Sequence, residues 1–263
     1  MTYDWEQTLQ ISPGSMEWYD EIDRRFLESA YYAIGPNGRP FGRFLDPDSV
    51  RGKQVLEIGC GMGTHAELLV RNGACLTAID QTTFAVESTR RRLALRRLEA
   101  RVLQEDAEKL TLADQSFDFV WTWGVIHHSS CTERCVSEIS RVLKSGGRLM
   151  MMVYYCPSLL YYLHCGLIRG IVLGQLLRRS LHEIYVKSMD GFYARVFSKS
   201  DLRKLLERDF HSLRITVVGI KAELYPLPRS GFKIALERLT PNWLAKAILG
   251  RVGSMVVVEA VRS

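Results

Sequence analysis

The sequence predicts an α/β fold with a Rossmann-like, mostly parallel sheet and helices on both faces. A first apolar run at residues 55–58 is followed by three closely spaced glycines and by a helix that begins near Thr64. A second apolar run at residues 74–80 ends in a carboxylate at roughly the twenty-residue spacing of nucleoside-binding βαβ units. Strand-like and helix-like segments continue to alternate, which favours parallel strands joined by crossover helices.

The segment VLEIGCGMG, residues 55–63, indicates what kind of ligand the first turn receives. Gly59, Gly61 and Gly63 let the backbone turn sharply and approach a ligand at the start of a helix. Glu57 precedes them, and its charge would repel the pyrophosphate of a dinucleotide. S-adenosylmethionine fits better, because it carries a sulfonium, an ammonium and an adenosine but no phosphate. The alternative is a tight strand-to-helix turn without a ligand.

Two further acidic residues follow strands at the same predicted edge of the sheet. Asp80 is the candidate for binding ribose hydroxyls, and its alternative role is the N-cap of a helix over residues 84–97. The third strand contains Val102 and Leu103 and precedes Asp106, which could accept a hydrogen bond from an adenine amino group. The carboxyl ends of parallel strands thus supply both candidates.

The next segments continue the alternation. Residues 117–128 read as the fourth strand and its exit loop, and residues 132–143 as a helix that the glycines of KSGG, residues 144–147, bring to an end. The fifth strand follows at residues 148–155. A helix capped by Ser198 and Asp201, a sixth strand near residues 213–221, a helical insertion near residues 231–249 and a seventh strand near residues 254–262 complete the chain.

Five ordered motifs carry a resemblance to a known family: VLEIGCGMGTHAELL, GACLTAID, DAEKL, SFDFVWTWGVIHHSS and SEISRVLKSGGRLMMMVYY. Over about residues 50–155 the chain resembles class I S-adenosylmethionine-dependent methyltransferases. Within that class it is similar to the type 11 group, which includes ubiquinone and menaquinone biosynthesis methyltransferases. The resemblance implies a seven-stranded sheet with an antiparallel last strand, an N-terminal helical extension, a helical lid after strand five, and S-adenosylmethionine as cofactor.

The same resemblance implies a set of cofactor-binding residues. The glycine segment would border the methionine moiety and ribose, Asp80 and Gln81 the ribose, Asp106 and Ala107 the adenine edge, and Trp123 and Gly124 the sulfonium end. The full set is Glu57, Gly59, Gly61, Gly63, Asp80, Gln81, Asp106, Ala107, Trp123 and Gly124. An indole face also attracts a nearby cation, although Trp121 and Trp123 alternate along one strand face and could equally be core residues.

His127 and His128 are the candidates for a catalytic role. Methyl transfer needs a base only where the acceptor must lose a proton, and a histidine at the exit of strand four suits that task. The alternative is a histidine that organises the loop through backbone hydrogen bonds. Both histidines lie near Cys131 and Cys135, but we expect no metal, because the family chemistry needs none and such cysteines are usually small buried hydrophobes.

The acceptor is expected to lie under the apolar segment at residues 156–177. This segment reads as a lid, with an interfacial membrane helix as the alternative, because Arg169, Arg178 and Arg179 flank it. Pro157 and the preceding strand argue against a transmembrane helix. Trp18, Tyr19 and Phe26 could line an N-terminal cap. The candidate acceptor-binding residues are Tyr19, Tyr154, Tyr161, Tyr193 and Arg195.

We expect a single methyltransferase domain, with residues 1–50 as a helical cap, 51–155 as the cofactor-binding core, 156–195 as the acceptor lid and 196–263 as the C-terminal part of the sheet. Six scattered cysteines without a C-x-x-C pair, and no recognisable signal peptide, favour a reduced, cytoplasmic protein, with peripheral contact at the inner membrane face as an option. The arginines of residues 90–97 are expected to form a solvated face.

The expected function is methyl transfer from S-adenosylmethionine to the O, C or N of a small apolar or aromatic acceptor. The net charge of +6 keeps nucleic acid under consideration. However, the chain has no RNA-binding appendage and no N/D-P-P-Y/F motif after strand four, so an RNA methyltransferase ranks lower. A non-catalytic S-adenosylmethionine-binding regulatory subunit is the alternative from a different functional class.

Overall fold

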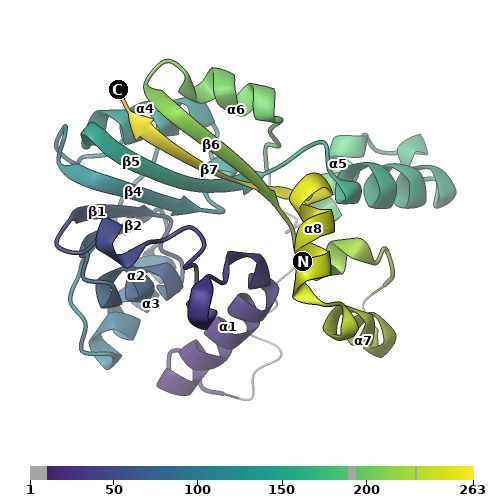
Figure 1. The fold of residues 1–263 in the computed structure, drawn as a ribbon, viewed down its shortest axis with the longest axis horizontal. Helices are drawn as coiled ribbons and strands as arrows, with labels where there is room; N and C mark the ends of the chain where they lie inside the picture. The colour runs from purple at the N-terminus through teal and green to yellow at the C-terminus, as the bar shows by residue number, and fades with distance from the viewer. Residues whose placement is uncertain (1–10, 189–193, 229) are drawn as a thin grey trace.

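The protein is described from a computed structural model that covers residues 11–188, 194–228 and 230–263. Seven strands form one sheet in the order β3-β2-β1-β4-β5-β7-β6 (Figure 1). Strand β7 is antiparallel to both of its neighbours, and the other pairs are parallel, which confirms the predicted fold class. The strands are β1 (Gln54–Ile58), β2 (Cys75–Asp80), β3 (Arg101–Gln104), β4 (Phe117–Trp123), β5 (Leu143–Tyr154), β6 (Phe210–Val218) and β7 (Met255–Arg262).

Helices cover both faces of the sheet because alternate strand residues point to opposite sides. On one face, α2 (Thr64–Arg71), α3 (Thr83–Leu95) and α8 (Asn242–Val252) pack against a core that includes Phe119, Trp121 and Met150. On the other face, α4 (Thr132–Val142) and α6 (Lys199–Leu206) pack against a core that includes Val120 and Met151. Helix α1 (Met16–Ser29) lies next to α3 and caps this side of the molecule (Figure 1).

Three predicted boundaries were wrong, each for a local reason. The glycine turn at residues 144–147 does not separate helix from strand: Leu143 already pairs with Phe117, and residues 144–147 form a bulge before Arg148 pairs with Phe119. Strand β6 begins at Phe210, three residues earlier than predicted, because a bulge between residues 211 and 214 extends its pairing. The single helical insertion is two helices, α7 (Gly231–Leu239) and α8, because Pro241 precedes α8.

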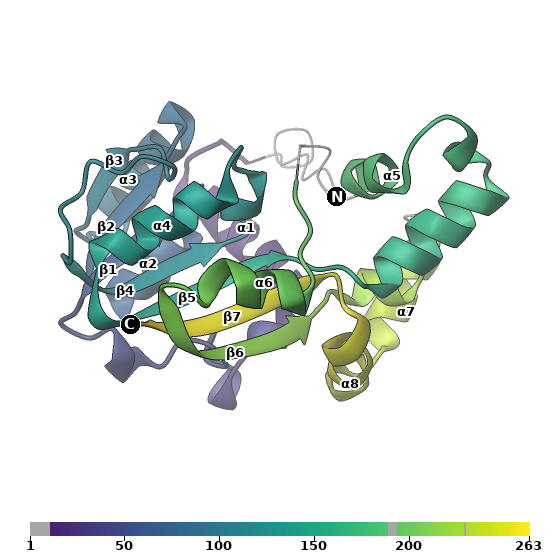
Figure 2. The same ribbon diagram turned by 90° about the horizontal axis from the view of Figure 1, so that it is seen from above.

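Short helical turns complete the cap and the lid. The cap contains η1 (Tyr31–Ala33), η2 (Pro36–Gly38) and η3 (Pro47–Ser49), while η4 (Ile126–His128) follows β4 and η7 (Lys221–Leu224) follows β6. After β5 come the π-helical segment η5 (Leu160–Val172), η6 (Gln175–Leu177) and α5 (Leu181–Ser188). Figure 2 shows that η5 and α5 extend away from the sheet, at the same end of the molecule as α7. None of the helices in the described ranges combines the length and apolarity needed to cross a bilayer.

Candidate functional site

The glycine loop joins β1 to α2 and is tied to the end of the neighbouring strand. The backbone N–H groups of Gly59 and Cys60 donate to the Ile79 carbonyl at 2.8 and 2.9 Å. Gly59 has a φ of +80°, and a Cβ atom there would lie 2.1 Å from Val125 Cγ2. Gly61 has a φ of +53°, and no heavy atom would lie within 4 Å of its Cβ. The loop is therefore closely packed at Gly59 and open at Gly61, as expected where a backbone receives a ligand.

Asp80, at the end of β2, holds this loop in place. Its Oδ2 accepts a hydrogen bond of 3.1 Å from the Gly61 N–H, and its Oδ1 accepts from the N–H and the hydroxyl of Thr82 at 3.0 and 2.9 Å. The N-cap of α3 is Thr82, whose hydroxyl accepts from Ala85 N–H, so the alternative assignment of Asp80 as the cap was wrong. Gln81 is exposed beside this carboxylate.

Glu57 is the most unusual titratable group near the loop. Only 1% of its surface is exposed, and neither carboxylate oxygen has a hydrogen-bond partner within the described part of the chain. Burial raises the pKa of this carboxyl to about 8; nearby Arg92 opposes that shift and Asp80 adds to it. A buried carboxylate without a partner is costly, and a bound cation would relieve that cost. The site therefore fits a cofactor that carries an ammonium group.

Arg92, which the sequence placed on a solvated face, is 1% exposed, and that expectation was wrong for this residue. Its guanidinium donates to Glu67 Oε2 at 2.8 Å and forms an ion pair with Asp23 of α1. It also donates to the Met62 carbonyl of the glycine loop at 3.4 Å. The ion network thus fastens both the loop and α1 to α3. The sequence did contain a signal for this burial, because Arg92 follows Ala85 and Thr89 at helical spacing, and both of these residues are buried.

Trp123 lies in a buried aromatic cluster that packs against α2. It stacks on Trp121 at a centroid distance of 5.1 Å and meets the edge of Phe41 at 5.0 Å, so both tryptophans point to the same face, as the alternation predicted. His65 of α2, which no sequence motif indicated, also belongs to this cluster, and its ring lies 4.6 Å from that of Phe41. Burial, with a contribution from Arg92, lowers the pKa of His65 to about 3, so this imidazole is neutral. Gly124 continues the strand, with a φ of +76° and its N–H bonded to the Met152 carbonyl.

The exit of β4 brings several predicted site residues together. The ring of His127 lies 4.1 Å from that of His128 and 4.0 Å from that of Tyr154. His127 is fully buried and its carbonyl accepts the Arg195 N–H at 2.8 Å. The Arg195 guanidinium donates to Glu133 at 3.0 Å and to the Ser130 carbonyl at 2.5 Å. Histidines from η4, a tyrosine from β5 and the end of the lid therefore meet at one place.

The remaining predicted acceptor-binding and adenine-binding residues that the structure describes lie away from the exit of β4. Tyr19 is buried between α1 and α3, where its hydroxyl donates to the Ser88 carbonyl at 2.8 Å. Tyr161 packs against Tyr185 between η5 and α5. Asp106 is exposed and accepts the Glu108 N–H in a local turn, next to the half-buried Ala107. Tyr193 lies outside the described residues.

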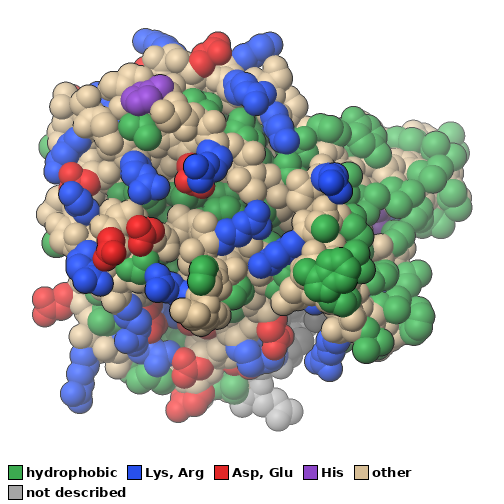
Figure 3. Space-filling model, viewed as in Figure 1, with side chains coloured by type: hydrophobic (Ala, Val, Ile, Leu, Met, Phe, Trp, Pro, Cys, Tyr) green, Lys and Arg blue, Asp and Glu red, His purple; other side chains and the backbone are tan. Residues whose placement is uncertain are grey.

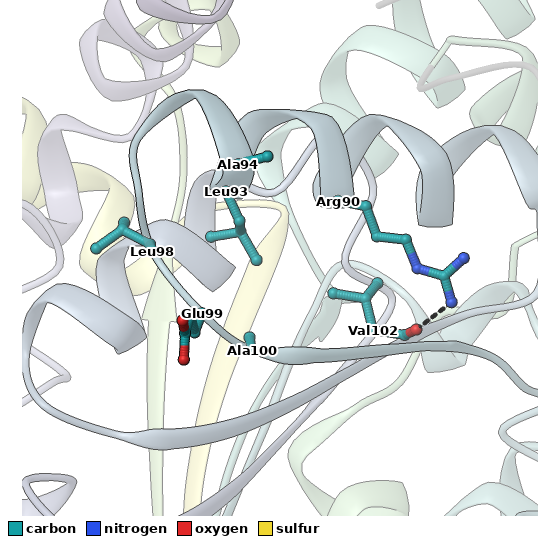
Figure 4. Close-up of a pocket in the computed structure, with 7 residues that line it drawn as sticks. All are labelled: Arg90, Leu93, Ala94, Leu98, Glu99, Ala100 and Val102. Carbon is teal, nitrogen blue, oxygen red and sulfur yellow. Dashed lines mark hydrogen bonds between the residues drawn. The ribbon is translucent and has the colours of Figure 1, made fainter.

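All six cysteines are free thiols, and within the described ranges no three His, Cys, Asp or Glu side chains gather as metal ligands. A hollow of about 390 Å³ lies between α3 and β3, where Arg90 donates to the Val102 carbonyl (Figure 4). Its lining contains none of the predicted site residues, so we assign it no part in binding the cofactor.

Comparison with known proteins adds independent information. A family model described as a methyltransferase domain matches residues 56–151. The ubiquinone biosynthesis O-methyltransferase of Coxiella burnetii is 28% identical over 101 residues, which cover 38% of this chain and 43% of that protein. The probable tRNA methyltransferase 9B of Mus musculus is 32% identical over 144 residues, which cover 51% of this chain and 30% of that protein. The matched regions thus span less than half of either relative.

The fold is also similar to that of solved methyltransferase structures. A crystal structure from Thermotoga maritima, described as a SAM-dependent methyltransferase and possible histamine N-methyltransferase, superposes with a TM-score of 0.57 at 21% identity. The superposition covers 94% of this chain and 97% of that chain. At this identity the likeness extends to the fold alone.

Proposed function

We propose, from the premise that residues 56–151 form a methyltransferase domain, that this chain transfers a methyl group from S-adenosylmethionine to a small apolar or aromatic acceptor. The observation that carries the proposal is the buried carboxyl of Glu57, which has no partner among the described residues, beneath a glycine loop that is open at Gly61. A cation and a closely approaching ligand would complete both features.

Each end of the cofactor has residues suited to it. Glu57 would attract the ammonium of the methionine moiety. Asp80 Oδ1 already accepts two hydrogen bonds from Thr82, but Oδ2 accepts only one, from Gly61, so Oδ2 can also accept from a ribose hydroxyl. Asp106 and Ala107 would lie along the adenine edge. The β4 exit, with Trp123 and Gly124, would face the sulfonium.

Bound S-adenosylmethionine would supply an electrophilic methyl carbon attached to sulfur. The task of the protein is then to align the acceptor and exclude water. The buried ring of His127, packed between His128 and Tyr154, offers an aromatic wall for the acceptor. Where the acceptor is a hydroxyl or a carbon acid, His127 or, as a second candidate, His128 would accept its proton.

The parts of the chain would serve one catalytic domain. Residues 51–155 would bind the cofactor, and residues 1–50 would cap it through the Asp23 and Arg92 ion pair. Residues 156–195 would cover the acceptor, and residues 196–263 would complete the sheet. An apolar acceptor is favoured because this cover is rich in leucine and tyrosine.

The names of similar proteins support methyl transfer more strongly than they support one acceptor. The relatives and the structural neighbour are named for a quinone pathway, for tRNA and for histamine. One fold hosts many acceptors, so the acceptor depends on the lid and not on the glycine loop. RNA methylation is a second candidate, favoured by the tRNA-related name and by the net charge of +6. A regulatory, non-catalytic subunit is the third.

A labelled-methyl assay separates these candidates. The protein is incubated with methyl-labelled S-adenosylmethionine and, in parallel, with a pooled small-metabolite extract or with unmodified tRNA. Label transferred to organic-soluble small molecules supports the proposal, and label on tRNA would replace it by RNA methylation. Binding of S-adenosylhomocysteine without transfer to either pool would favour the regulatory subunit.

A further inference from the structure

Two segments of the chain carry most of its exposed apolar side chains. We name residues 159–188 the lid segment and residues 230–252 the insertion segment. Together they make up 53 of the 263 residues, yet they contain 13 of the 16 large hydrophobic side chains that are exposed among the described residues. These are Tyr162, Leu167, Ile171, Val172, Leu173, Leu176, Leu177, Phe232, Ile234, Leu239, Trp243, Leu244 and Ile248.

Most of the surface of several of these side chains is exposed to solvent. Leu177 is 89% exposed, Leu239 79% and Trp243 71%. Isolated exposed hydrophobics are ordinary on a protein surface, whereas a collection of this size marks an interaction site. Figure 3 shows these green side chains gathered over the extended part of the molecule, where α5, α7 and α8 lie in the same view.

The two segments belong to the same end of the molecule. Both ribbon views place η5, α7 and α8 at the end of the molecule that lies away from β3 (Figures 1 and 2). The electrostatics agree: burial lowers the pKa of His164 in the lid segment, and the charge of Lys233 in the insertion segment contributes to that shift. Two parts of the sequence that are separated by residues 189–229 therefore form one apolar surface.

The net charge of this surface indicates what kind of partner binds to it. The two segments hold 8 of the 35 Lys and Arg residues and 2 of the 29 Asp and Glu residues, so their formal charge is +6, which equals that of the whole chain. The remaining residues balance, with 27 of each sign. The whole positive excess thus lies in the segments that also expose the apolar side chains. The lid segment contributes Arg169, Arg178, Arg179 and Lys187, and the insertion segment Lys233, Arg238, Lys246 and Arg251.

We propose that the lid and insertion segments bind the surface of an anionic phospholipid bilayer. Apolar side chains with a tryptophan among them, interspersed with basic residues, match the boundary between acyl chains and negatively charged headgroups. A second copy of this chain fits less well, because two surfaces of charge +6 would repel each other. This inference goes beyond the proposed methyl transfer and does not require it.

Together with the proposed methyl transfer, on which this consequence alone rests, such docking would give the lid segment a second role. The lid follows β5, whose Tyr154 packs against His127, so the candidate acceptor site and the bilayer-facing surface lie at successive positions of one chain segment. An acceptor dissolved in the bilayer could then reach the site without crossing water. The chemical class implied is a lipophilic molecule with a methylatable polar group.

Vesicle co-sedimentation tests the proposal. The full chain is mixed with vesicles of phosphatidylcholine alone or with about 30% phosphatidylglycerol, at low and high salt. We expect binding to the anionic vesicles that is at least about tenfold tighter than to neutral vesicles and weakens with salt. The triple variant Leu177→Gln, Phe232→Gln, Trp243→Gln should lose most of this binding. The matched control is Phe84→Gln, which removes a side chain of similar exposure outside the two segments.

Three results would overturn the proposal. They are no binding to anionic vesicles, binding that the triple variant retains in full, and a concentration-dependent dimer that the triple variant abolishes while vesicles are not bound. A cooperative urea unfolding transition of the triple variant checks that it is folded, and calorimetry with S-adenosylhomocysteine tests cofactor binding separately. A chain that binds vesicles but no cofactor would contradict only the proposed function.

Discussion

The Gly61 N–H donates a hydrogen bond of 3.1 Å to Asp80 Oδ2, which joins the glycine loop after β1 to the end of β2. Thr89 of α3 completes the attachment, because its hydroxyl donates to the Gly61 carbonyl at 3.1 Å. Both polar groups of the Gly61 backbone are thereby held, while the space above its Cα stays open. The loop is fixed before any ligand binds, which lowers the entropic cost of binding.

The open space at Gly61 leads to a first prediction. Gly61→Ala should weaken S-adenosylhomocysteine binding by about tenfold or more, because the new methyl group occupies the space above the loop. Its cost in folding stability should be only about 1 kcal/mol, from the positive φ. Gly146→Ala is the matched control, since Gly146 also has a positive φ, of +74°, and open space around it, but lies in the bulge of β5. Equal loss of binding in both variants would contradict a ligand at Gly61.

The raised pKa of Glu57 leads to a prediction for stability. Its folded pKa of about 8 lies above the ordinary value of 4.5, so its contribution to stability is fully present below about 4.5 and is lost as pH rises through about 8. Glu57→Gln should therefore unfold at higher urea concentration than the wild type at a pH of about 8, and the two should converge at lower pH. A wild type that is the more stable at alkaline pH would contradict the assigned burial.

The same carboxyl gives a prediction for ligand binding. If a ligand ammonium binds ionised Glu57, S-adenosylhomocysteine affinity should rise with pH between about 6 and 7.5, by at most about tenfold per pH unit. Glu57→Gln should abolish this rise. Methylthioadenosine lacks the amino acid part and serves as the control ligand, whose affinity should not depend on pH through Glu57. Calorimetry at several pH values measures the affinity for both ligands. The same pH dependence for both would contradict the binding of the ligand ammonium by Glu57.

The buried Arg92 predicts a large effect on folding. Arg92→Met leaves Glu67 and Asp23 without their shared partner and should destabilise the protein by about 3–5 kcal/mol, measured by urea unfolding. Arg24→Met is the control, because Arg24 forms ion pairs with Glu21 and Glu28 within α1 and its side chain is 53% exposed. That variant should change stability little. A similar loss of unfolding free energy in the two variants would mean that the buried ion pairs of Arg92 stabilise the fold no more than exposed ion pairs do.

His127 is predicted to act on turnover and not on cofactor binding. Once an acceptor with a hydroxyl or carbon acid is found, His127→Gln should lower kcat by about 10²–10⁴-fold and leave S-adenosylhomocysteine affinity unchanged. His128→Gln should have the smaller effect, because His127 is the fully buried member of the pair. An unchanged kcat in His127→Gln would assign this histidine to loop organisation.

The sheet and the polar residues at the carboxyl ends of its strands could be predicted from the sequence, because their signals are local; the ligand contacts of those residues stay a prediction. Apolar runs followed by Gly61, Asp80 or Asp106 identify strands and the loops at their carboxyl ends without tertiary information. Contacts between segments that are distant in the sequence could not be predicted in this way. Arg92 reads as one of several surface arginines until Asp23 from α1 and Glu67 from α2 are brought to it.

Some predicted ends of helices and strands were wrong for a related reason. The glycines of residues 144–147 suggest a helix end, but their bulge exists only because β4 pairs on both sides of it. The sequence indicated an interfacial membrane helix as the alternative for the lid, but it did not predict the surface that the lid and insertion segments share, since only the folded chain brings η5 and α7 to the same end of the molecule. Fold class thus follows from local pattern, while the ion network and the exposed surface follow from tertiary packing.

The most direct test of the central claim is calorimetric titration of the folded protein with S-adenosylhomocysteine. We predict saturable binding at one site per chain, weakened at least about tenfold in Asp80→Ala because the ribose contact and the support of Gly61 are both lost. Asp118→Asn should bind as the wild type does, since Asp118 contacts Lys144 and Gln54 at the opposite end of the sheet. Absence of binding to a folded chain, or undiminished affinity in Asp80→Ala, would contradict the assignment of this loop to S-adenosylmethionine.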